Sequence, residues 1–202
     1  MTTPRDLVIL ALDAALDRPP RQGDLSLALA GAELADLLAA RSVRLDDERI
    51  MPDRPTTTTD PLLDRAASSL LRQPPYESVD DWLWRRGRGL ATAYLTAMEA
   101  EGQLTRRRRH RTPFGAGELV PADTPERRAA TERWASHELV LSVLAVAAGI
   151  GDTRAQEEPT GVEDSVLTVL AAVDGAVREL EAVRQRRAIE DAAFDNVWRG
   201  AG

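Results

Sequence analysis

LVLSVLAVAAGI, residues 139–150, is the most apolar stretch of this 202-residue chain. Residues 139–148 carry apolar side chains on every side of a helix, which is typical of a helix buried in the centre of a domain. The stretch is too short to span a membrane, because a spanning helix needs roughly 20 apolar residues. We therefore expect a mainly α-helical globular domain with residues 139–148 as its central buried helix.

Helical patterns continue on both sides of this stretch. Downstream, apolar residues recur from Val166 to Leu180 at alternating spacings of four and three, which predicts one long amphipathic helix docked on the core. Upstream, Asp60 is placed to cap one helix, and Ser78 with Asp81 resembles a capping box at the start of another. The helix that Asp60 caps is predicted to end near residue 72, and further helices are predicted over residues 7–16, 24–41, 90–101 and 125–136.

Two short β-hairpins are predicted between the helices. The first pairs Val43–Leu45 with Arg49–Met51. The second pairs Gln103–Arg107 with Glu118–Pro121 and has a long, arginine-rich tip. The sequence has no internal repeat and no linker long enough to separate domains, so residues 1–202 are expected to form one domain.

The amino-acid composition excludes several classes of enzyme. The chain has 33 acidic and 26 basic residues, a net charge of -7, and every basic residue is an arginine. It has no lysine, no cysteine and two histidines, His110 and His137. Lysine nucleophiles, phosphate-binding lysines, thiolate nucleophiles and thiolate zinc sites are therefore excluded. Neither histidine lies in a motif with a nucleophile, so we expect no catalytic residue, metal or cofactor.

No targeting segment is evident at the N-terminus. The apolar run Leu7–Leu12 is six residues long and is flanked by Asp6 and Asp13, which does not fit a signal peptide. We expect a cytoplasmic protein, peripherally associated with the inner face of a membrane.

The arginines are concentrated in one part of this acidic chain. Between Trp82 and Arg111 there are eight arginines against Glu99 and Glu101, a local charge of +6 that leaves -13 for the remainder. These arginines are Arg85, Arg86, Arg88, Arg106, Arg107, Arg108, Arg109 and Arg111. A basic face on an acidic body orients a protein toward an anionic partner. The run at residues 106–109 also fits a solvated hairpin tip that discourages aggregation.

Aromatic residues accompany these arginines. Phe114 follows Pro113 in the predicted hairpin tip, where its burial in a membrane would contribute roughly 1.5–3 kcal/mol. Trp82 and Trp84 lie about 200° apart around a helix, so they cannot both face one core. Either Trp84 contacts a membrane or a partner, or both tryptophans are buried between neighbouring elements. Each basic residue near an anionic bilayer contributes roughly 1 kcal/mol. Together with the burial of Phe114, the arginines would support reversible binding to a membrane surface.

Five segments, in order, resemble the Golgi phosphoprotein 3 family, whose members include bacterial proteins. The resemblance runs over most of the chain and is best from Thr3 to Leu104. The segments are RDLVILALD (residues 5–13), LAGAEL (29–34), PLLD (61–64), the tryptophan helix from Trp82, and EGQL (101–104), which leads into a hairpin. The resemblance implies a single, mainly helical domain around a buried apolar helix, with no enzymatic activity.

The resemblance also implies partners. Eukaryotic members of the family are peripheral membrane proteins that recognise phosphatidylinositol 4-phosphate and insert a hairpin into the bilayer. They act as adaptors that hold glycosyltransferases by their cytoplasmic tails. The membrane hairpin corresponds to Thr105–Leu119 of this sequence, and its tip here is basic rather than mostly apolar.

The family's lipid pocket corresponds only in part to residues of this chain. Its tryptophan falls near Arg21, in a segment without aromatic residues, and its three arginines fall on Ala30, Arg88 and Ala91. Arg85 and Arg88 reproduce the spacing of the family's arginine pair one helical turn earlier. The resemblance therefore implies general affinity for anionic lipid.

We hypothesise a non-catalytic peripheral membrane protein that binds anionic phospholipid head groups, such as phosphatidylinositol 4-phosphate, through the eight arginines, with Phe114 and Trp84 as membrane contacts. One alternative is a protein-interaction adaptor without lipid binding, whose partners would include cytoplasmic tails of membrane proteins. Another is a winged-helix-like nucleic-acid binder, since a helix followed by a basic hairpin has that outline. Glu99 and Glu101 on that helix would repel phosphates, so no nucleic-acid partner is expected.

Overall fold

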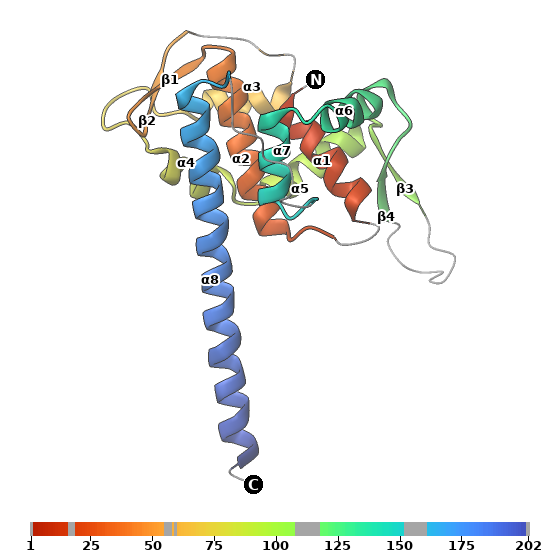
Figure 1. Cartoon of the computed structure of the whole chain (residues 1–202), viewed down its shortest axis with the longest axis vertical. Helices are drawn as coiled ribbons and strands as arrows, with labels where there is room; N and C mark the ends of the chain where they lie inside the picture. Colours follow the sequence, from red (N-terminus) through yellow and green to blue (C-terminus); the bar gives the residue numbers. More distant parts are fainter. Residues whose placement is uncertain are drawn as a thin grey trace.

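The computed structural model describes residues 2–15, 19–54, 58, 60–107, 118–151 and 161–200, and the side chains of the last helix as far as residue 192. Within these residues the chain is mainly α-helical, as predicted, with two small antiparallel sheets (Figure 1). The helices are α1 (Thr3–Ala14), α2 (Gln22–Ala39), α3 (Pro61–Ser68), α4 (Val79–Arg86), α5 (Leu90–Ala100), α6 (Pro125–Ala135), α7 (Leu139–Ala147) and α8 (Asp164–Gly200). The strands are β1 (Val43–Asp46), β2 (Arg49–Pro52), β3 (Leu104–Arg107) and β4 (Glu118–Pro121). No described helix is both long and apolar enough to cross a membrane.

Helix α2 forms the centre of the fold. Thirteen of its 18 residues are buried, and α1, α4, α5, α7 and α8 all contact it. Small residues such as Ala28 and Gly31 let these neighbours approach closely, while Leu29 and Leu34 fill the space between them. The core of the domain is therefore a layer of helices packed around α2.

Helix α7 is not the central helix that its composition predicts. Only Leu141, Leu144 and Ala145 are buried, and the other residues of α7 are half-buried. The helix packs with one side on α1, α2 and α8. The prediction is wrong because bulky valines and leucines make α7 the most apolar segment, whereas the central position depends on small residues that admit neighbours from several sides.

The starts of two helices follow their predicted caps. The side chain of Asp60 accepts a hydrogen bond from the N–H of Leu62 at 3.0 Å. Ser78 Oγ accepts one from the N–H of Asp81 at 3.0 Å. Each side chain satisfies a backbone donor that the first turn of a helix leaves free. Helix α3 ends at Ser68, a turn earlier than predicted.

Both predicted hairpins form. In the first, β1 pairs with β2 so that Val43 lies opposite Pro52. In the second, β3 pairs with β4 so that Leu104 lies opposite Pro121. The predicted arginine-rich tip of the second hairpin falls on residues 108–117, outside the described residues.

Helix α8 packs on the core with its first half and projects beyond it with its second half (Figure 1). This confirms the predicted docked helix, which contacts α2, α4 and α7. Its buried residues are Val166, Val169, Leu170, Val173 and Ala176. From Gln185 to Ala192 every side chain is exposed, including Ile189 at 69%. The helix continues to Gly200, well past the apolar pattern that predicted it.

Replacing Gly31 with alanine is expected to lower the free energy of unfolding by about 1–3 kcal/mol, the usual cost of overpacking a core. A Cβ at this position would lie 2.3 Å from Val173 Cγ2, and the stiff valine side chain cannot turn away, so α2 and α8 would have to separate. Gly175 of α8 is the matched control, because a Cβ there meets nothing within 4 Å. Its replacement with alanine should stabilise the helix by about 0.5–1 kcal/mol. Urea denaturation measures the free energy of unfolding of both variants. Equal effects of the two replacements would contradict the close packing of α2 and α8.

Candidate functional site

A surface pocket of about 390 Å³ lies where α2 and α5 begin, α4 ends and α8 leaves the core. Because four helices contribute its walls, the tertiary fold builds this pocket and no single sequence segment contains it. We call it the α2/α5 pocket. Its lining residues are Gln22, Gly23, Ser26, Leu27, Trp84, Gly87, Arg88, Gly89, Thr92 and Leu180.

Two glycines present Arg88 at this pocket. A Cβ on Gly87 would lie 2.7 Å from the carbonyl oxygen of Leu83, so the link from α4 to α5 runs too close to backbone for a side chain. Gly89 has a φ of 70°, a left-handed conformation that favours glycine, and α5 begins directly after it. Arg88 between them is exposed and has no carboxylate partner among the described residues.

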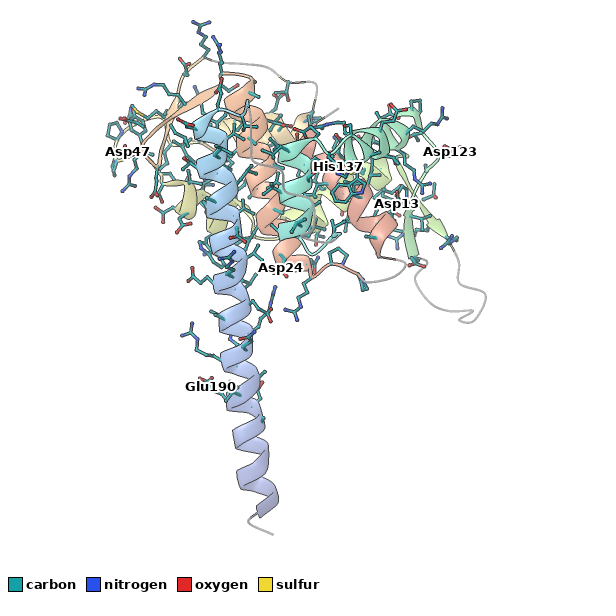
Figure 2. The ribbon with its side chains drawn as sticks, viewed as in Figure 1. Asp13, Asp24, Asp47, Asp123, His137 and Glu190 are labelled. Atoms are coloured by element: carbon teal, nitrogen blue, oxygen red, sulfur yellow. The ribbon has the colours of Figure 1, made fainter. Side chains whose placement is uncertain are left out.

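Two further arginines reach the edge of the α2/α5 pocket, and both are paired with carboxylates. Arg184 of α8 lies 2.7 Å from Asp24 and 3.5 Å from Glu181. Arg21 forms an ion pair with the same Glu181. Figure 2 shows Asp24 where the start of α2 meets α8. The two helices are in close contact here, since a Cβ on Gly23 would lie 2.8 Å from Arg184 Nη2.

The starts of α2 and α5 add backbone donors to the pocket. The N-cap residues of both helices make no side-chain cap. In α5 the N–H of Leu90 donates to the carbonyl oxygen of Gly87 and the N–H of Ala91 donates to Ser26 Oγ, so the free first-turn N–H groups lie mainly in α2. The side chain of Gln22 donates a hydrogen bond to Thr92 Oγ1 at 2.7 Å and so joins the two helix starts. Free N–H groups and the helix dipole both favour an anion at such a position.

Arg86, a predicted site residue, is directed into the core. Its guanidinium donates to the carboxylate of Glu33 at 2.7 and 2.8 Å and to the carbonyl oxygen of Leu62 at 3.2 Å. Tyr94 Oη donates to Glu33 at 3.0 Å. Burial raises the pKa of Glu33 above its ordinary value, and burial together with the neighbouring Glu33 raises the pKa of Tyr94. This network joins α2, α4 and α5, and its guanidinium is not free to hold a ligand.

The two tryptophans of α4 have different environments. Trp82 is fully buried, and its Nε1 donates to the carbonyl oxygen of Ala30 at 3.1 Å. Arg85 lies over its ring, 5.2 Å from the centroid, and donates to Glu77 at 2.6 and 2.7 Å. Trp84 is half-buried and lines the α2/α5 pocket. The structure therefore brings Trp84 and Arg88 together and directs Arg85 elsewhere.

The remaining predicted site residues belong to the second hairpin. Arg106 donates to Glu99 at 2.5 and 2.9 Å, and Arg107 at the outer end of β3 is exposed. In Figure 1 the outer ends of β3 and β4 point in the same direction as the projecting half of α8. The predicted site residues Arg108, Arg109, Arg111 and Phe114 lie outside the described residues.

Two positions that the family resemblance assigned to arginines are buried alanines in this structure. Ala30 and Ala91 are both fully buried, and the N–H of Ala91 donates to Ser26 Oγ at 3.2 Å. Beside Ala91 lies a second, largely apolar cavity of about 230 Å³ between α1, α2 and α5. Of the three positions that the family resemblance assigned to arginines, Arg88 is the one at which this chain has an arginine.

Sequence reasoning missed the other polar residues of the pocket. Gln22 and Thr92 line the pocket from helices far apart in the chain, and Glu181 and Arg184 lie beside it on a third helix. No sequence motif joins these residues, because only the packing of α8 against α2 places them at one site.

The fold and the site together define a class of protein. It is a single, mainly helical domain with a β-hairpin and a small surface pocket at which one arginine has no carboxylate partner among the described residues. The sequence pattern of Golgi phosphoprotein 3 (GPP34) matches residues 4–198, and the chain belongs to that family. The family is in general one of non-catalytic, adaptor-type proteins. No curated protein matches the chain.

Proposed function

We propose that this protein is a non-catalytic peripheral membrane protein that binds anionic phospholipid head groups in the α2/α5 pocket. The observation that carries the proposal is Arg88, an exposed guanidinium with no described carboxylate partner, at a pocket walled by Trp84. The planar guanidinium fork suits phosphate oxygens, which it can contact in pairs. Membership of the family supports the same role.

The second hairpin supplies further attraction to the membrane. Arg107 is exposed at the outer end of β3, and the sequence continues with three more arginines through Arg111. Each basic residue near an anionic surface contributes roughly 1 kcal/mol, and this attraction falls with salt. The hairpin therefore gives reversible, salt-sensitive affinity, and the pocket gives recognition of the head group.

Arg85 and Arg86 take a structural role in this proposal, because Glu77 and Glu33 already occupy their guanidinium groups. The protein would lie on the inner face of a membrane, where anionic lipids attract basic segments. Cytoplasmic tails of membrane proteins remain proposed partners of an adaptor bound at that surface.

Vesicle co-sedimentation tests the proposal. The protein is expected to pellet with vesicles that contain anionic lipid and to stay in solution with neutral phosphatidylcholine vesicles. Replacing Arg88 with alanine should weaken binding about 10- to 150-fold, since a hydrogen bond to a charged group contributes roughly 1.5–3 kcal/mol. Arg44, an exposed arginine of β1 in the first hairpin, is the matched control, and its replacement with alanine should leave binding unchanged.

A variant with residues 106–109 of the second hairpin changed to glutamate separates the contribution of the hairpin from the contribution of the α2/α5 pocket. Its binding should fall most at low salt, where the long-range attraction is strongest. If the wild-type protein pellets with no vesicle, the proposed function is wrong. If Arg44→Ala weakens binding as much as Arg88→Ala, binding depends on overall charge and not on the pocket.

A further inference from the structure

We infer that the α2/α5 pocket selects a singly charged phosphodiester head group, of the phosphatidylglycerol type, over a doubly charged phosphate monoester such as phosphatidylinositol 4-phosphate. This inference rests on the proposed function and names the lipid class that the same site takes. It follows from the charges that surround the pocket, from how rigidly they are held, and from the neutral groups between them.

The charged groups at the pocket leave about one positive charge for a ligand. Arg88 is the one charged side chain among the described residues that line the pocket. Beside the pocket, Arg21 and Arg184 supply two positive charges, and Asp24 and Glu181 supply two negative ones. Both carboxylates already pair with arginines. Asp24 lies in the first turn of α2 and offsets the dipole of that helix, and two first-turn N–H groups of α5 already have partners, so the helix starts add only a small further positive charge. The sum matches a phosphodiester, which carries one negative charge.

A phosphate monoester is a poorer match. It carries about -1.5 to -2 at neutral pH, because its second pKa is near 6. Its second negative charge would find no second cation among the described residues that line the pocket, and the carboxylates of Asp24 and Glu181 lie beside the pocket. Like charges at short range disfavour binding, and this repulsion is screened only in part within a pocket.

The packing of α8 against α2 fixes this charge balance. A Cβ on Gly23 would lie 2.8 Å from Arg184 Nη2 and 2.9 Å from Leu180 Cδ2, so the two helices are in direct contact at the pocket. Glu181 lies on the same turn of α8 and pairs with Arg21 and Arg184. Ion pairs with Arg184 and Arg21 hold the two carboxylates beside the pocket, where the side chain of Asp24 is 13% exposed and that of Glu181 is 36% exposed.

Neutral polar groups line the rest of the pocket. Gln22, Ser26 and Thr92 offer an amide and two hydroxyls, and Trp84 supplies an apolar wall. Hydroxyl groups of a glycerol head group can exchange hydrogen bonds with such side chains. With about 390 Å³, the pocket has room for a head group of this size.

The test compares two sets of vesicles at matched surface charge, one containing phosphatidylglycerol and the other phosphatidylinositol 4-phosphate, each in phosphatidylcholine. The wild-type protein is expected to bind the phosphatidylglycerol vesicles about threefold to fivefold more tightly, the range that one partly exposed charge interaction provides. Equal or stronger binding to the phosphatidylinositol 4-phosphate vesicles would overturn the inference.

Glu181→Gln should reverse the preference, because it removes one negative charge and leaves Arg21 without its carboxylate partner. Glu179→Gln is the control, since Glu179 is exposed on the same helix, about 200° around it from Glu181 and so directed away from Arg21 and Arg184. It removes the same charge and should keep the wild-type preference. If both variants shift the preference equally, net charge decides it and the inference fails. If no anionic vesicle binds the wild-type protein at all, the proposed function fails with it.

Discussion

Replacing Arg86 with alanine is expected to lower the free energy of unfolding by about 3–5 kcal/mol, the usual cost of breaking a buried ion pair. The change leaves the carboxylate of Glu33, which has 0% exposure, without its counter-charge in the centre of the fold. The side chain of Arg86 is itself 18% exposed, and it also holds the carbonyl oxygen of Leu62. Urea denaturation of the purified variant measures the loss.

The pH dependence of this loss identifies its cause. Burial already raises the pKa of Glu33, and removal of Arg86 raises it further. A group whose folded pKa lies above its unfolded value stabilises the fold when protonated, and that contribution is lost as pH rises through the folded pKa. The defect of Arg86→Ala should therefore be largest at neutral pH and shrink as the pH falls and Glu33 becomes protonated.

Arg106→Ala is the control for this prediction. Its ion pair with Glu99 is exposed, at 51% and 32% for the two side chains, and exposed pairs contribute little to stability. We expect no resolvable change. A double variant, Glu33→Gln with Arg86→Met, should recover part of the lost stability because it leaves no charge buried. Equal stability of Arg86→Ala and Arg106→Ala would contradict the internal role of Arg86.

Replacing Trp82 with alanine is the second change with a large expected effect, a loss of about 3–5 kcal/mol. The indole is fully buried between α4 and α2, so its removal leaves a cavity, and the carbonyl oxygen of Ala30 loses its hydrogen bond from Nε1. Arg85 also loses the ring on which it lies. Thermal or urea denaturation should show the loss directly.

Trp84→Ala gives the complementary result. Trp84 is half-buried at the α2/α5 pocket, so its removal should cost less stability than the removal of Trp82 and should weaken vesicle binding. The two variants distinguish a tryptophan of the core from a tryptophan of the binding surface. A folded Trp82→Ala protein of wild-type stability, or a Trp84→Ala protein with unchanged vesicle binding, would contradict this assignment.

Local signals in the sequence predicted the local structure well. Asp60 and Ser78 cap their helices as expected, because a cap depends only on residues within one turn. The hairpins form at the predicted positions, and the spacing from Val166 onward identified the docked part of α8. The central helix was not predictable from apolarity, because the position of α2 depends on the small size of residues such as Gly31 and on which neighbours they admit.

The candidate site was predictable only as a region. The run of arginines indicated a basic surface, but the sequence does not show which arginines have internal partners. Glu33, the partner of Arg86, is 53 residues away in the chain. Leu180, which lines the same pocket as Arg88, belongs to a helix at the other end of the sequence. Such pairings are fixed by helix packing and leave no local pattern.

The projecting half of α8 limits the angles at which the domain can approach a flat membrane. About 20 residues follow Leu180, a length of about 30 Å at 1.5 Å per residue. They leave the core beside the α2/α5 pocket and point the same way as the outer ends of β3 and β4 (Figure 1). Between residues 181 and 192 they carry six charged side chains, which stay in water rather than enter a bilayer. We therefore expect a bound domain to tilt until α8 lies along the membrane surface, which would fix both its orientation and the face it turns away from the membrane.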